Sequence, residues 1–294
     1  MSEATAPPAA RPRRPFAWPS ASVVVAASML AFVVVVVLLG PLLPGYDPLR
    51  QNLLDRNLGI MAVGRSGTFY LLGTDMLGRD LLGRLIQGGQ ISVTIALAAT
   101  LLAAALGTAL GIIAGYFGGV VDSVINGLCD LLLAVPRILF FIALFAIITP
   151  SVLNLVLILA LTSWAIFARV IRAMTLSLRE REFVQVAHTF GAPASWTLRR
   201  HILPHVLGKV VILGSLELGN MIMLEAALSY LGLGVQPPNA SWGLMINQAQ
   251  SHISTNPKLV ILPGLAIFLL VAGTNFISQA FTGESRGSNA GAGV

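Results

Sequence analysis

Long apolar runs alternate with polar stretches along this chain. A helix that spans a membrane needs about 20 mostly apolar residues, and runs of that kind lie at residues 23–43, 91–116, 121–148, 152–171, 206–230 and 259–280. The first run is longer than the apolar core of a cleaved signal peptide, about 7 to 15 residues, which favours an uncleaved helix. The pattern predicts an all-α, polytopic membrane protein with about six transmembrane helices.

The polar stretches divide the chain into segments. Residues 1–20 form an N-terminal segment and residues 21–43 the first transmembrane helix, followed by a polar external segment over 44–90. Residues 91–281 form the core transmembrane domain. Residues 282–294 are rich in glycine, serine and alanine, and we expect this tail to be disordered.

Composition agrees with a membrane protein. The chain is 56% hydrophobic and only 10% charged, whereas a soluble domain has about 25% charged residues, so a water-soluble fold is excluded. The net charge of +6 comes from arginines that flank the apolar runs, which indicates topology rather than a nucleic-acid surface. Positive residues favour the cytoplasm, which places both termini and the arginine-rich stretch after the fourth run on that side.

The second predicted span carries a row of small residues. Gly107, Gly111 and Gly115 lie four residues apart on one helix face. Such rows let helix backbones approach closely in lipid. The row therefore predicts close packing, either within the chain or against another subunit.

The arginine-rich stretch, residues 179–205, has the pattern of a short helical hairpin. Its apolar residues follow the i, i+3, i+4, i+7 spacing of one helix face, and they are Phe183, Val186, Ala187 and Phe190. We expect Gly191 to end this helix, Pro193 to open a second one and Pro204 to close the second. An amphipathic hairpin of this kind either lies on the lipid surface or inserts its apolar face into a groove of a partner protein.

Four charged residues fall within the predicted spans: Asp130, Arg137, Glu217 and Glu225. Each would cost about 2.5–3.5 kcal/mol if it faced lipid at a helix centre, so we expect them to face the bundle or a wet cavity. Asp130 and Arg137 share one helix face but lie about 10 Å apart, as do the two glutamates, which predicts partners on other helices. They line a polar translocation path, or they lie near a membrane edge and reach water.

Candidate sites for chemistry are few. A phosphate-binding loop needs G-x-x-x-x-G-K-[ST], whereas the only Gly-Lys pair, at 208–209, is followed by valine. His201 and His205 have a metal-compatible spacing, but Pro204 interrupts their helix. We therefore expect no catalytic residue, no cofactor and no metal.

Three further residues have simple structural interpretations. Asp75 and Asp80 are expected in a solvated external loop or at a helix N-terminus, where a carboxylate caps free backbone N–H groups. Trp242 follows a proline-rich turn and is interpreted as an anchor at the membrane interface.

Several separate motifs resemble one family of transporters. The stretch EFVQVAHTFGA, residues 182–192, followed by RRHILP, resembles the cytoplasmic EAA signature of permeases in ABC importers, with Gln185, Val186 and Ala187 in the EAA positions and Gly191 at its glycine. Two of the three EAA residues differ here. GTDMLGRD, GYFGGVVD and LSYLGLGVQPPNASWG resemble the C-type permeases of the dipeptide, oligopeptide and nickel group, in the same order and over residues 20–275.

The resemblance implies the type I ABC importer permease fold, in a bacterial inner membrane. Two related permeases would form one pathway, two ATPase subunits would bind at the cytoplasmic side, and an external binding protein would deliver di- or oligopeptides. It also implies that the hairpin docks into an ATPase through Glu182, Phe183, Gln185, Val186, Ala187, Phe190 and Gly191. The alternatives are nickel or another small solute as cargo, or a proton-coupled secondary transporter that uses the intramembrane carboxylates.

Overall fold

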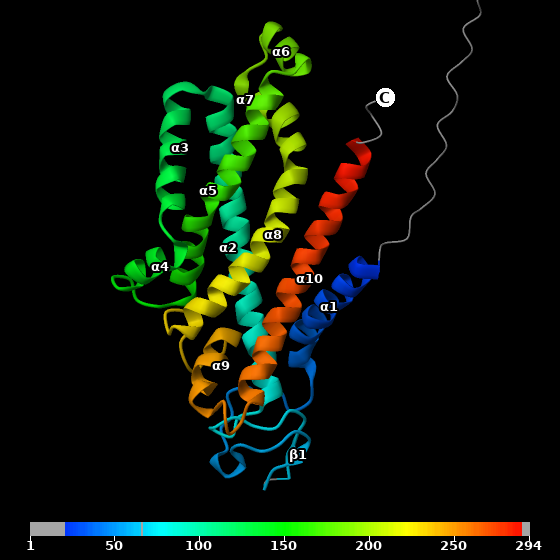
Figure 1. Cartoon of the computed structure of the whole chain (residues 1–294), viewed down its shortest axis with the longest axis vertical. Helices are drawn as coiled ribbons and strands as arrows, with labels where there is room; N and C mark the ends of the chain where they lie inside the picture. Colours follow the sequence, from blue (N-terminus) through cyan, green and yellow to red (C-terminus); the bar gives the residue numbers. More distant parts are fainter. Residues whose placement is uncertain (1–20, 66, 290–294) are drawn as a thin grey trace, which may run out of the picture.

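A computed structural model describes residues 21–65 and 67–289 of the chain, so the predicted segment 1–20 and the last five residues lie outside it. Most of the described chain forms helices that run along one long axis (Figure 1). They are α1 (Ala21–Leu39), α2 (Leu81–Phe117), α3 (Gly119–Ala134), α4 (Arg137–Phe145), α5 (Val152–Arg179), α6 (Glu182–Thr189), α7 (Ala194–Thr197), α8 (Leu203–Tyr230), α9 (Trp242–Ala249) and α10 (Lys258–Asn289).

Helices long and apolar enough to cross a membrane confirm the predicted class. Four such stretches are Leu81–Phe117, Val152–Arg179, Ala194–Tyr230 and Lys258–Phe276. The bent pair α3–α4 makes a fifth if it counts as one span, and α1 is a shorter apolar helix. Together these elements correspond to the six predicted apolar runs.

The third predicted span is not one straight helix. α3 and α4 meet at an angle of 89°. Pro136 has no N–H to donate and disfavours helical geometry in the residue before it. Val135 accordingly adopts an extended conformation, and the chain turns before α4 begins at Arg137.

Three other predicted boundaries differ from the structure. α2 begins at Leu81 rather than at residue 91, because the Asp80 side chain accepts hydrogen bonds from the N–H groups of Leu82 and Gly83 and caps the helix. α5 continues to Arg179 instead of ending near residue 171. α10 continues to Asn289, into the tail expected to be disordered, since extending an existing helix is easier than starting one.

Pro204 does not close the second helix of the hairpin, contrary to the prediction. α7 passes through a π-helical turn, Leu198–Ile202, directly into α8, and Pro204 lies in the first turn of α8. A wider π turn accommodates a residue that has no N–H to give to the helix ladder. Ala194–Tyr230 is therefore one continuous helix of 37 residues.

The glycine row packs within the chain. A methyl group added at Gly107 would lie 2.3 Å from the backbone oxygen of Trp164, and one at Gly111 would lie 2.6 Å from that of Ala168. Gly115 similarly faces Thr175. The row thus forms the close contact between α2 and α5, which answers the question that the sequence left open.

The polar segment between α1 and α2 forms a cap at one end of the bundle (Figure 1). It contains a short antiparallel pair, β1 (Ala62–Val63) with β2 (Phe69–Tyr70). The Lys258 ammonium group at the start of α10 donates to the carbonyl of Leu58 and, at 3.3 Å, to that of Leu72. These bonds tie the cap to the last helix.

Trp242 is a core residue rather than an interfacial anchor. It is 2% exposed, and its indole N–H donates to the carbonyl of Leu85 at 2.9 Å. Its ring lies beside Gly88 and Gly89, which leave space for it on α2. Helix α9 is thereby fixed against the N-terminal part of α2.

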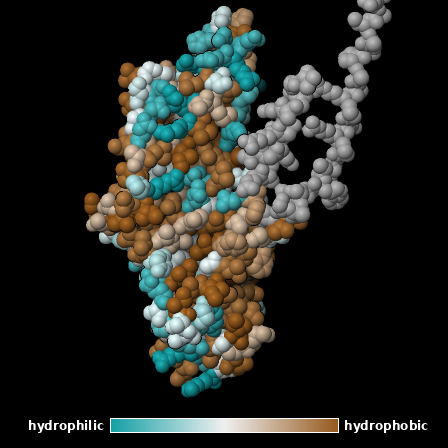
Figure 2. Space-filling model, viewed as in Figure 1, coloured by the Kyte–Doolittle hydropathy of each residue, from teal (hydrophilic) through white to brown (hydrophobic). Residues whose placement is uncertain are grey.

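The surface has the polarity of a membrane protein. Figure 2 shows hydrophobic residues over much of the molecule, with hydrophilic ones gathered over α6, in a smaller patch at mid-height, and mixed with hydrophobic ones at the cap that holds β1. The hairpin and the cap therefore lie at opposite ends.

Candidate functional site

The hairpin forms a compact unit at the end of α5. α6 begins at Glu182 and ends at Thr189, Phe190 follows it as the C-cap residue, and Gly191 then takes a φ of +74°. Only glycine adopts this left-handed conformation without strain, and a side chain added at Gly191 would meet no atom within 4 Å. Gly191 is therefore needed for backbone direction rather than for space.

Two aromatic contacts attach α6 to the long helix that follows it. The ring of Phe183 stacks on His205, with centroids 5.4 Å apart, and lies 5.6 Å from the ring of His201. Both histidines thus have an aromatic partner. Val184, which lies off the predicted apolar stripe, is the residue of α6 that is most deeply buried, at 2% exposure.

The predicted apolar stripe divides into two parts. Phe183 and Ala187 are partly buried within the hairpin, whereas Val186 is 52% exposed and Phe190 is 86% exposed. The pattern therefore placed too many residues on one exposed face, because it could not show that Phe183 packs against His201 and His205 of the following helix. Glu182 and Gln185 are exposed beside Val186.

A basic groove adjoins this surface. Ser195, Trp196, Arg199 and Arg200 line a cavity of about 430 Å³. Trp196 is 48% exposed, and the ring of His201 lies 5.0 Å from it. This end of the molecule thus presents apolar side chains next to positive charge.

The structure brings two of the predicted intramembrane charges together. Arg137, at the start of α4, lies 3.6 Å from the Glu217 carboxylate on α8. Asn220 donates to the same carboxylate at 3.1 Å, and Glu217 is only 4% exposed. The bend at Pro136 directs Arg137 toward α8. The break in the third span therefore makes this ion pair possible.

Glu225 lies deeper in the bundle and is fully buried. The Ser229 hydroxyl donates to its Oε1 at 2.7 Å, and the side chains of Ser92 and Ser241 lie near the carboxyl group. Its Oε2 has no hydrogen bond of good geometry within the described residues. Three hydroxyls from α2, α8 and the start of α9 thus surround one carboxyl group.

Asp130 lies apart from this group, on the outer surface of the chain. It pairs with Arg169 of α5 at 2.5 Å, and the side chains of Arg169 and Asp130 are 52% and 71% exposed. Of the four predicted charges, Arg137 and Glu217 therefore form a largely buried pair, Glu225 is a separate buried carboxyl group, and Asp130 is exposed and paired with Arg169.

Sequence reasoning missed the polar cluster next to the cap. Asp75 is not solvated, because it is 8% exposed and pairs with Arg79 at 2.7 Å. Arg84, which was given no role, is 1% exposed. A basic residue in the first turn of a helix interacts unfavourably with the helix dipole. The position of Arg84 near the start of α2 could therefore have indicated that it has a role beyond helix formation.

The chain matches a family model described as the inner membrane component of binding-protein-dependent transport systems over residues 107–283. It is 35% identical over 252 residues to a peptide permease protein of Brucella suis biovar 1, which covers 83% of this chain and 82% of the relative. It is 38% identical over 207 residues to the glutathione transport system permease protein of Shigella flexneri serotype 5b, with 70% of this chain and 68% of the relative covered.

Proposed function

The chain belongs to the family of inner membrane components of binding-protein-dependent transport systems, and we propose that it forms part of the pathway through which short peptides enter the cell. As a member of this family it is a multi-pass permease subunit of an ABC importer. Partner ATPases would supply the energy, and the hairpin at 179–205 would receive it.

The observation that carries the coupling proposal is the exposure of Phe190 and Val186 at a polar end of the protein. Phe190 is 86% exposed and Val186 is 52% exposed, whereas Phe183, Val184 and Ala187 of the same helix are partly or fully buried. An exposed aromatic residue on a short amphipathic helix is typical of a helix that inserts into a partner's groove. The hairpin lies at the far tip of the molecule (Figure 1), which favours a partner protein over the lipid surface as its contact.

Peptides are the proposed cargo because two relatives are named for peptide and glutathione transport. The Arg137–Glu217 pair supplies a positive and a negative group on two different helices. Such a pair in the pathway would meet both charged ends of a peptide. Nickel and other small solutes are the competing cargo.

A second permease is the proposed partner at the surface of α3 and α5. Asp130 and Arg169 are more than half exposed on helices of the membrane-spanning region, and charged groups that face lipid are costly. A second permease would cover this pair. The remaining partners would be two ATPases at the hairpin and an external binding protein at the cap, with both chain termini in the cytoplasm.

Transport in a reconstituted system tests this function. The chain, a matched permease and two ATPases are placed in liposomes with the binding protein at the cap side, and uptake of a labelled dipeptide is measured with and without ATP. We expect uptake that requires ATP and all the subunits. Uptake driven by a proton gradient without ATPases would contradict the proposal and favour a secondary transporter in which the buried Glu225 carries the proton. Nickel uptake measured in parallel would identify the alternative cargo.

A further inference from the structure

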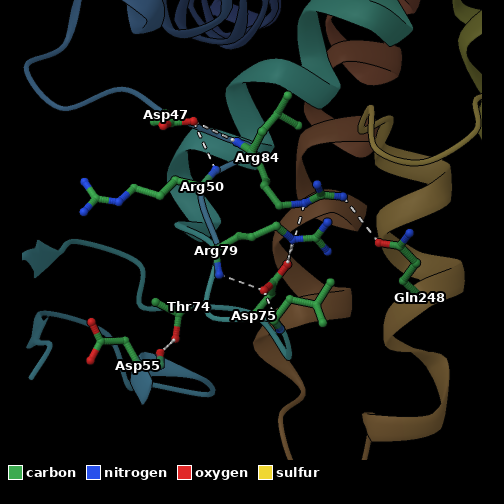
Figure 3. A network of polar contacts seen from close by, with 10 residues as sticks. Asp47, Arg50, Asp55, Thr74, Asp75, Arg79, Arg84 and Gln248 are labelled. Atoms are coloured by element: carbon green, nitrogen blue, oxygen red, sulfur yellow. Dashed lines mark hydrogen bonds and ion pairs between the residues drawn. The ribbon is translucent and has the colours of Figure 1, made fainter. Parts of the chain in front are cut away.

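A cavity of about 580 Å³ lies at the end opposite the hairpin, between residues 75–84 and helix α9. Cavities of roughly 300–1,000 Å³ suit small ligands. Its polar lining includes Asp75, Arg79, Arg84, Gln248 and His252. Figure 3 shows Arg79, Arg84, Asp75 and Gln248 converging from the cap, α2 and α9.

Arg84 has unused hydrogen-bonding capacity in this cavity. It is 1% exposed, and its Nη2 donates to Gln248 Oε1 at 3.3 Å. Its Nε lies 3.7 Å from Asp75 Oδ2, and its Nη1 has no partner among the described residues. A buried guanidinium group left without its hydrogen bonds is costly, which points to a missing acceptor.

Asp75 does not fill that need, because its Oδ2 lies 3.7 Å from Arg84 Nε, beyond hydrogen-bonding distance, while closer donors contact both of its oxygens. Its Oδ2 accepts from Arg79 Nε at 2.7 Å, and its Oδ1 accepts from the backbone N–H groups of Leu77 at 2.9 Å and of Arg79 at 3.0 Å. The nearby Asp80 is engaged at the start of α2, where it caps Leu82 and Gly83.

The charges in the cavity therefore do not balance. Two guanidinium groups face one carboxylate, which leaves one positive charge in a cavity whose remaining walls include Met76, Leu81 and Met245. Arginine binds carboxylates through paired, charge-assisted hydrogen bonds. A ligand with one negative group and an apolar body would complement this arrangement.

We infer that this cavity binds the C-terminal carboxylate of a short peptide, with Arg84 and Arg79 as its ligands. The choice of a peptide rests on the proposed function, whereas the choice of a carboxylate rests on the unpartnered Arg84 Nη1 and the excess positive charge. Gln248 fixes the guanidinium plane from α9, and the apolar walls receive the peptide's side chains. The site would hold cargo at the outer end before it reaches the Arg137–Glu217 pair.

Calorimetry on the full chain in lipid nanodiscs, without ATP or ATPases, tests this site. The probes are Ala-Ala, its C-terminal amide, acetate and inorganic phosphate. We expect Ala-Ala to bind and the amide to bind at least tenfold more weakly. Equal binding of acid and amide, or no binding of either, would overturn the inference. Phosphate that binds as tightly as Ala-Ala would overturn the assignment to a peptide.

Substitutions test whether the peptide binds at this cavity. Gln248→Glu places a carboxylate 3.3 Å from Arg84 Nη2, where the amide oxygen lies now, and should abolish Ala-Ala binding while preserving the fold. Arg84→Gln should weaken binding at least tenfold, and a thermal unfolding curve checks that it is folded. The control Arg50→Gln removes the same charge from an exposed position in the same segment and should change affinity by less than twofold.

Three other results would refute the site. Retained binding in Gln248→Glu would do so, and so would a loss in Arg50→Gln equal to that in Arg84→Gln. Cross-linking of the cavity to an external binding protein, with no peptide affinity, would instead assign it to protein docking. Because no ATPase is present, failure here leaves ATP-driven uptake and hairpin coupling to be judged by their own assays.

Discussion

Substitution of Phe190 by alanine should weaken ATPase binding without unfolding the permease. The Phe190 side chain is 86% exposed, so its removal leaves no cavity in this chain. In the proposed complex the ring would be buried in the ATPase. The structure thus separates the effect on docking from the effect on folding at this one position.

The expected magnitude follows from the area of the ring. Burial of a phenylalanine side chain contributes about 1.5–3 kcal/mol, and about 1.4 kcal/mol corresponds to a tenfold change in affinity. Phe190→Ala should therefore weaken ATPase binding by about 10- to 150-fold. The melting temperature of the purified permease should stay unchanged, because the ring contributes little to its own fold.

The assay titrates purified ATPase onto the assembled permease pair in nanodiscs and measures affinity and ATP hydrolysis. Phe117→Ala is the matched control, because Phe117 is also an exposed phenylalanine, at 56%, and lies at the end of α2 outside the hairpin. Phe183→Ala is the structural contrast and should lower the melting temperature through lost contacts with His201 and His205. Equal ATPase affinity for Phe190→Ala and the original chain would refute the docking role.

Three further predictions concern packing and charge. Gly107→Ala should destabilise the chain by about 1–3 kcal/mol because its methyl group meets the α5 backbone, whereas Gly214→Ala, in open space, should leave the unfolding temperature nearly unchanged. Glu217→Gln should destabilise by about 1–3 kcal/mol by leaving Arg137 unpaired, and adding Arg137→Gln should restore much of that stability; additive losses would contradict the pairing. Gly191→Val should cost about 1–2 kcal/mol because of its positive φ, while Gly191→Asn should be milder in the same thermal assay.

The sequence predicted the helices well because their length and apolar character are local properties. Pro136 lies within the third predicted span, but its presence alone does not predict the 89° bend, since a proline inside a helix either kinks it or ends it. At Pro204 the error is the reverse: a helix end was predicted, but the helix continues. The π turn that allows this depends on contacts that the local sequence pattern does not contain. At these two prolines the predicted helix boundaries were wrong because backbone hydrogen bonding departs from the regular α-helical pattern.

The candidate sites were less predictable because they depend on contacts between distant parts of the chain. The Arg137–Glu217 pair joins residues 80 positions apart along the sequence (217 − 137). The Arg84–Gln248 bond joins residues 164 apart. Trp242 was misjudged and the burial of Val184 was missed for the same reason, since only the folded chain shows which residues are covered.

The continuous helix Ala194–Tyr230 explains how one subunit could connect its two polar ends. At about 1.5 Å per residue, its 37 residues span about 55 Å. It begins in the hairpin, carries Glu217 and Glu225, and ends where the Tyr230 hydroxyl donates to Gln250 at 2.9 Å, just beyond α9. A helix broken at Pro204 would absorb a push at the hairpin as local bending. An unbroken helix would instead move the ion pair, the buried carboxyl group and the contact with α9 together. In the proposed complex, force applied by an ATPase at one end would then reach the proposed peptide cavity at the other.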